Sequence, residues 1–196
     1  FIFGMLGTMF TQSLMPWIIW EIHILSAYIV GILTAKPPET HHMNMPSEKF
    51  QFYRAVPTAV KTMGNICGWV ILFRMILVLF EKWFLGIFSP PIRILLSGLL
   101  ELSNGCVQFV GIESMSLRFV ISLLMISFGG FCVTMQTASF APPGTIKCYL
   151  FGKIYQCMIA LILSVPVIML IDNLFLCLFI LPFISLFVIA ISYIGK

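Results

Sequence analysis

Charged side chains are scarce in this 196-residue sequence: Asp, Glu, Lys and Arg make up 9% of it, whereas hydrophobic residues make up 60%. A soluble domain is typically about 25% charged, so this few charges cannot cover a surface that faces water. The scarcity excludes a soluble enzyme and a nucleic-acid-binding protein, and the net charge of +4 therefore indicates no nucleic-acid partner. Together with a mean hydropathy of +1.07, it predicts an all-α, polytopic membrane protein.

Sequence signatures of catalysis and metal binding are also missing. The six cysteines stand singly without a CxxC pair, so neither a disulfide framework nor a zinc site is indicated. His41 and His42 have no further ligand at metal-binding spacing. No HExxH, GxSxG, P-loop or dinucleotide fingerprint occurs. We therefore expect no enzyme activity, no metal and no cofactor.

Long apolar runs dominate what is present. A membrane core takes about 20 apolar residues per helix, and four segments are predicted as plain spans: 14–35, 63–80, 150–171 and 174–194. Asp172-Asn173 between the last two predicts a tight helical hairpin. The chain begins at Phe1 inside an apolar run with no signal-peptide pattern, so we expect it to continue a larger protein.

Residues 36–62 are predicted as a loop and an interfacial helix. Residues 36–49 form the one properly hydrophilic stretch. From Phe52 to Met63, apolar residues recur at three- and four-residue spacing, which is typical of a helix that lies in the interface and leads into a span.

Residues 89–140 do not fit plain spans. One apolar stretch is interrupted by Glu101–Gly105 and the next by Gly129-Gly130. Such residues favour chain breaks, because they accept turn conformations and satisfy freed backbone groups. Broken backbone survives at membrane depth only where protein or a water-filled cavity covers it. Two interrupted segments in succession indicate the binding site of a transporter.

The distribution of basic residues predicts the orientation. With 90–112 as a re-entrant hairpin and 119–140 as a broken span, seven basic residues share one side, against Lys82, Arg93 and Arg118 on the other. The seven are Lys36, Lys49, Arg54, Lys61, Lys147, Lys153 and Lys196. This predicts a cytoplasmic 36–61 loop. Exchanging the two broken segments gives eight against two, so charge does not decide which one is the hairpin.

Glu101 is the most informative polar residue. A carboxylate at membrane depth costs several kcal/mol and is by default a functional-site hypothesis. It is expected either to bind a cation, a proton or a polar substrate, or to cap its own chain break or pair with Arg74. Arg74, in the 63–80 span, is expected either to compensate Glu101 or to attract an anionic substrate.

Other polar residues lie in the spans. Thr134 and Gln136 follow Gly129-Gly130 and offer a hydroxyl and an amide to a substrate; the alternative is a helix crossing with Gln136 as an interhelical hydrogen bond. Glu21 and His23 either belong to a proton path or snorkel to the interface.

Four motifs resemble the sporulation integral membrane protein YlbJ family. They are Phe1-Ile2-Phe3-Gly4 with Gly7-Thr8, His23-Ile24-Leu25-Ser26-Ala27, Gly98-Leu99-Leu100-Glu101-Leu102-Ser103-Asn104-Gly105, and Phe128-Gly129-Gly130-Phe131 with Gln136. That family belongs to the nucleoside-recognition (Gate) domain superfamily, related to concentrative nucleoside transporters. The resemblance implies one Gate-type domain over residues 1–196, the C-terminal part of a larger transporter that forms a homodimer.

The resemblance also implies a site. The Glu101–Gly105 break becomes the tip of a re-entrant hairpin and Gly129-Gly130 the break in the next span, both facing substrate near the midplane. The implied substrate-binding residues are Glu101, Ser103, Asn104, Gly105, Gly129, Gly130, Thr134 and Gln136. Glu101, Arg74 and His23 are the expected charge partners, with H⁺ or Na⁺ as the coupling ion.

The function implied by the resemblance is transport of a small polar or anionic metabolite during endospore formation. Export of dipicolinate from mother cell to forespore, through the outer forespore membrane, is the expected activity. Two alternatives stay open: a nucleoside-type transporter, and a structural membrane protein whose 36–61 loop docks a partner in spore assembly. Dipicolinate is a dianion, so Glu101 opposes it unless the carboxyl is protonated or holds a cation; a neutral nucleoside avoids that conflict.

Overall fold

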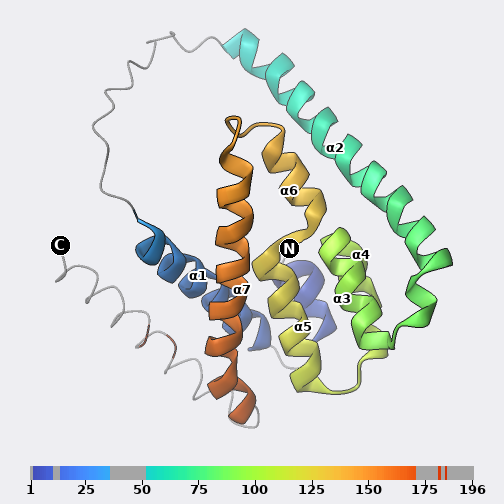
Figure 1. Cartoon of the computed structure of the whole chain (residues 1–196), viewed down its shortest axis with the longest axis vertical. Helices are drawn as coiled ribbons and strands as arrows, with labels where there is room; N and C mark the ends of the chain where they lie inside the picture. Colours follow the sequence, from blue (N-terminus) through green and yellow to red (C-terminus); the bar gives the residue numbers. More distant parts are fainter. Residues whose placement is uncertain (1, 11–13, 36–51, 171–180, 182–183, 185–196) are drawn as a thin grey trace.

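The computed structural model describes residues 2–10, 14–35, 52–170, 181 and 184, and the structural statements below concern these residues (Figure 1). Their regular structure is helical throughout. The predicted span 174–194, apart from Leu181 and Ile184, the Asp172-Asn173 turn and the 36–49 loop lie outside the described residues.

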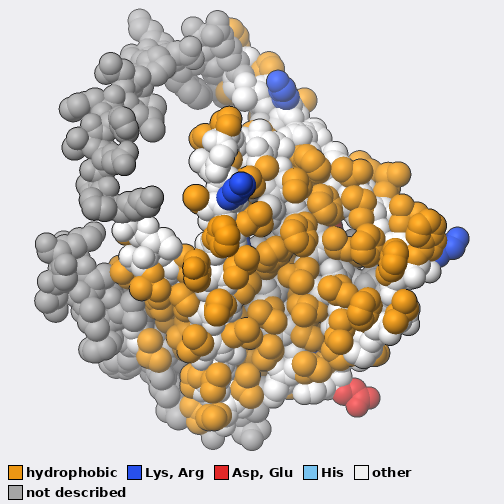
Figure 2. Space-filling model, in the orientation of Figure 1, with side chains coloured by type: hydrophobic (Ala, Val, Ile, Leu, Met, Phe, Trp, Pro, Cys, Tyr) orange, Lys and Arg blue, Asp and Glu red, His pale blue; other side chains and the backbone are white. Residues whose placement is uncertain are grey.

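Four helical segments are long and apolar enough to cross a membrane, which confirms the all-α polytopic fold. They are α1 (Met15–Thr34), most of α2 (Phe52–Trp83), α5 with α6 (Met115–Phe128 and Gly130–Ala138), and α7 (Thr145–Met169). The face in Figure 2 is almost continuously hydrophobic, and the few charged side chains visible on it lie toward its edges. This is the surface expected of a chain immersed in lipid.

The α2 helix covers two predicted segments. It runs unbroken for 32 residues, so the segment predicted to lie in the interface continues into the span 63–80 as a single helix. At 1.5 Å per residue it is about 48 Å long, which exceeds a hydrocarbon core of about 30 Å. It lies along the outside of the other helices (Figure 1), and Phe73 and Leu77 are its buried side chains.

The α7 helix corrects a predicted boundary. It begins at Thr145, directly after Pro142-Pro143-Gly144, and not at residue 150. Gly144 has a φ of +87°, a conformation that glycine adopts without strain. Lys153 therefore lies two turns inside the helix, and it does not belong to the loop charges that were counted for the orientation.

A short helical hairpin lies beside α5. Its first arm, α3 (Pro90–Leu100), has 11 residues, and its second arm, α4 (Leu102–Val107), returns beside it (Figure 1). An 11-residue helix is about 16 Å long, roughly half of a membrane core. The α3 helix is thus too short to cross the layer, whereas Met115–Ala138 is long enough, which favours residues 90–112 as the predicted re-entrant segment.

The two arms approach each other through glycines. A β-carbon built on Gly105 would lie 2.5 Å from the Gly98 Cα atom, and one on Gly98 would overlap the Met125 side chain of α5. The two arms can come this close only because glycine has no β-carbon at either position. The Met125 side chain packs against both glycines.

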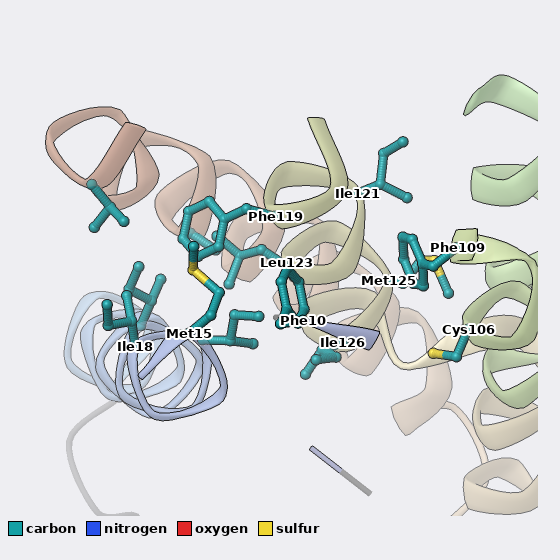
Figure 3. Packing of buried hydrophobic residues seen from close by; sticks show 14 of the residues in the cluster. Phe10, Met15, Ile18, Cys106, Phe109, Phe119, Ile121, Leu123, Met125 and Ile126 are labelled. Atoms are coloured by element: carbon teal, nitrogen blue, oxygen red, sulfur yellow. The ribbon is translucent and has the colours of Figure 1, made fainter. Parts of the chain in front are cut away.

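The α5 helix is the centre of the core. In Figure 3, Phe119 and Leu123 lie on the side of Met15 and Ile18 from α1, whereas Met125 points to Phe109 and Cys106 of the hairpin segment. Leu123, Met125 and Phe119 are fully buried. One helix therefore joins the α1–α7 pair to the hairpin.

The close contact between Gly98 and Gly105 can be tested by substitution. Gly105→Ala is expected to destabilise the protein by about 1–3 kcal/mol, because the added methyl group meets Gly98 backbone that cannot rotate away. Gly86→Ala is the control, since a β-carbon there would have no atom within 4 Å. Thermal unfolding in detergent measures both; equal melting temperatures would refute the close packing of α3 and α4.

Candidate functional site

The two chain breaks lie against each other. Gly129 ends α5 with a φ of +84°, and Gly130 opens α6 with a φ of +82°. A β-carbon built on Gly130 would lie 3.5 Å from the Gly98 carbonyl oxygen and 3.6 Å from the Leu102 amide nitrogen. Backbone of the second break thus lies against backbone of the first.

Glu101 caps the shorter hairpin arm. Its carboxylate oxygens accept hydrogen bonds from the backbone amides of Ser103 (3.1 Å) and Asn104 (2.9 Å). The side chain is 8% exposed. A side-chain acceptor at this position satisfies amides that have no partner inside the helix. Of the predicted roles for Glu101, the capping of its own chain break is the one the contacts support.

This cap corrects the predicted extent of the first break. Only Glu101 is extended (φ −142°, ψ 115°); Ser103, Asn104 and Gly105 already lie in α4. The helix can restart after a single residue because the Glu101 carboxylate accepts the hydrogen bonds of the first free amides of α4.

The predicted pairing of Glu101 with Arg74 is not formed. Arg74 is exposed on α2, and in the described part of the chain no ion pair joins the two side chains. Glu101 instead lies within electrostatic range of the thiols of Cys106 and Cys132. The Glu101 carboxylate oxygens accept hydrogen bonds from backbone amides of the hairpin itself.

Thr134 and Gln136 lie on α6, the helix that begins at this crossing. Thr134 is buried, and its hydroxyl donates to the Gly130 carbonyl at 3.1 Å. The Gln136 amide donates to the Cys132 sulfur at 3.4 Å. Both side chains therefore bond within their own helix, and Gln136 makes no interhelical hydrogen bond to a described residue.

Some polar side chains beside the two breaks make no hydrogen bond to the described part of the chain. The buried hydroxyls of Ser97 and Ser127 have no partner among the described residues. The Asn104 side-chain amide is half-buried and likewise unpartnered within the described part of the chain. Buried polar groups are nearly always satisfied, so an unsatisfied one in a fold calls for a water, an ion or a ligand.

His23 does not join this crossing. It lies between α1 and α7, where the Gln156 amide nitrogen is 3.2 Å from the His23 carbonyl oxygen and 3.3 Å from its Nδ1 atom. Gln156 Oε1 in turn accepts from Lys153 Nζ at 3.2 Å. Sequence reasoning missed this cluster because it placed Lys153 near a loop. The signal was available: Lys153 and Gln156 stand at helical i, i+3 spacing in an apolar run.

A cavity of about 350 Å³ lies at the other end of the hairpin, next to α2. Glu81, Arg93 and Gln108 line it, and the Gln108 amide donates to Glu81 at 3.3 Å. Among the described residues, no group of three His, Cys, Asp or Glu side chains is placed to hold a metal ion.

Searches for related proteins returned no match to a family model, a curated protein or a solved structure.

The cap on α4 generates the second test. Glu101→Ala is expected to cost about 1–3 kcal/mol of stability, because two amides at membrane depth lose their acceptor. Glu101→Gln retains one carbonyl acceptor and is expected to lose less. Thermal unfolding of the two variants in parallel checks the order; a Glu101→Ala protein as stable as the wild type would show that the cap is dispensable.

Proposed function

We propose that this chain is part of a membrane transporter that binds a small polar metabolite at the crossing of the hairpin and the broken α5–α6 segment. The contact of Gly130 with the Gly98–Leu102 backbone is the observation that carries the proposal. A tightly packed structural bundle has no need of two chain breaks, and irregular backbone at membrane depth is typical of transporter binding sites.

The polar groups at the crossing support a ligand of modest size with both donors and acceptors. The Asn104 amide and the Ser97 and Ser127 hydroxyls are unpartnered in the described structure. The α6 helix also starts here, and its first amides have no acceptor inside the helix. Positive ends of half-helices favour anionic groups. Such a site suits carboxylate or hydroxyl groups on a planar metabolite.

The glycine pair supports a means of rearrangement. Gly129 and Gly130 both have left-handed φ values, and the Phe128 and Phe131 rings on either side are in edge contact, with centroids 5.1 Å apart. Backbone that glycine can repopulate without strain allows α6 to change its angle to α5. We propose that this movement alternates access to the crossing.

Dipicolinate, moved from mother cell to forespore during endospore formation, is the cargo that the family resemblance suggests. The proposal places the protein in the outer forespore membrane as a homodimer, with a cytoplasmic 36–61 loop. Coupling to H⁺ or Na⁺ belongs to the same proposal. Because Glu101 already accepts two backbone hydrogen bonds, its carboxylate acts first as the cap of α4, and the two amide dipoles partly offset its charge toward a ligand.

A paired substitution tests the transport site. Asn104→Ala combined with Gln136→Ala removes two side-chain amides from the crossing and is expected to lower spore dipicolinate by about tenfold or more, since each lost polar contact costs about 1 kcal/mol. The measurement is dipicolinate content of spores, normalised to the amount of the full-length protein in the membrane.

The control is Gln108→Ala, which removes an amide from the same hairpin at its other end, where Gln108 bonds Glu81. It is expected to leave dipicolinate unchanged. Normal dipicolinate in the double variant, at normal protein level, would overturn the assignment and favour a structural role in which the 36–61 loop docks a partner.

A further inference from the structure

Lys153 lies at the depth of the Gly129-Gly130 break. The α7 helix runs antiparallel to α5 (Figure 1), and the Cys157 thiol is 3.9 Å from the Leu124 carbonyl oxygen. Lys153 is one turn from Cys157 toward the start of α7, and the break is five residues from Leu124 in the same direction. The Lys153 backbone therefore lies at about the same level along the α5–α7 pair as the break, on the side of α5 that faces α1 and α7.

The contacts of this ammonium group are neutral. Its Nζ atom donates to Gln156 Oε1 at 3.2 Å and lies 5.8 Å from the centre of the Tyr149 ring. Gln156 is buried, and its amide nitrogen bonds the His23 carbonyl, which fixes the orientation of Oε1. In the described structure no carboxylate, including Glu21 of α1, forms an ion pair with Lys153.

An ammonium group in a span is normally paired or faces a water-filled space, because its charge is costly in an apolar layer. One hydrogen bond to an amide uses only one of its three donors. Lys153 is half-buried, so part of the side chain lies outside the packed core. The charge calls for an anion that the described chain does not supply.

We propose that Lys153, oriented by Gln156, binds a carboxylate group of a small aromatic acid. The Tyr149 ring beside the ammonium group favours a planar aromatic ligand over an aliphatic one. This inference adds a second anion site to the proposed transporter, on the side of α5 opposite the hairpin crossing, and rests on the proposed function for the identity of the cargo: the positive charge is supplied by α7 and not by Arg74.

Binding to the purified full-length protein in nanodiscs tests the inference without a transport assay. The probes are pyridine-2,6-dicarboxylate and benzoate, with benzamide as the neutral counterpart of benzoate. Both carboxylates are expected to raise the melting temperature in a concentration-dependent way, and benzamide is not. Equal effects of benzoate and benzamide, or no effect of either carboxylate, would overturn the inference.

Two substitutions locate the binding site. Lys153→Met is expected to weaken carboxylate binding by about tenfold or more, equivalent to about 1.4 kcal/mol. Lys147→Met is the control, because Lys147 is exposed near the start of the same helix. Affinity that is equal in the wild type and in Lys153→Met contradicts the proposal.

Lys153→Gln keeps the test decisive if Lys153→Met does not fold. It removes the positive charge, retains a side-chain amide donor toward Gln156 Oε1, and leaves the bond from Gln156 to the His23 carbonyl in place. It is expected to abolish carboxylate binding while the protein stays folded; retained binding would refute a role for Lys153. Normal spore dipicolinate in the Asn104→Ala, Gln136→Ala variant, together with carboxylate binding that depends on Lys153, would contradict the proposed function and leave the Lys153 site standing.

Discussion

The hydrogen bonds from the Ser103 and Asn104 amides to Glu101 are the interaction on which the hairpin depends. A chain that stops and restarts a helix in an apolar layer exposes backbone amides that no water can satisfy. Because one carboxylate takes both amides, the turn needs a single extended residue, and α4 can return directly beside α3. The contact of Gly98 with Gly105 and the position of Met125 then follow from that short turn.

The α5 helix links the hairpin to the rest of the described fold. Met125 fixes the hairpin on one side, and Phe119 and Leu123 pack toward α1 on the other (Figure 3). The helix ends at Gly129, so its end meets the tip of the hairpin. The backbone of both segments is irregular at this contact. Two polar regions result, separated by α5: the crossing at Glu101, and the Lys153–Gln156–His23 cluster.

The sequence predicted much of the fold because apolar length and glycine position are local signals. The spans at α1, α2 and α7 follow from runs of apolar residues, and the break at Gly129-Gly130 follows from the only residue type that accepts two successive left-handed φ values. Partners far apart in the chain could not be predicted. Nothing in the spacing of Glu101 distinguishes a cap on its own helix from a pair with Arg74, and nothing in α1 indicates that His23 meets Gln156 across 133 positions.

The placement of charge bears on what can bind between these elements. The Glu101 charge is spread over two amide hydrogen bonds to its own backbone, which reduces the field that a ligand at the crossing meets. The Lys153 charge is held by a neutral amide and an aromatic face, which leave it uncompensated within the described structure. A negative charge engaged by the protein and a positive charge left for a ligand together favour an anion over a cation. The conflict between Glu101 and a dianionic cargo is thereby weaker than the sequence alone suggests, because the carboxylate belongs to the architecture of the hairpin.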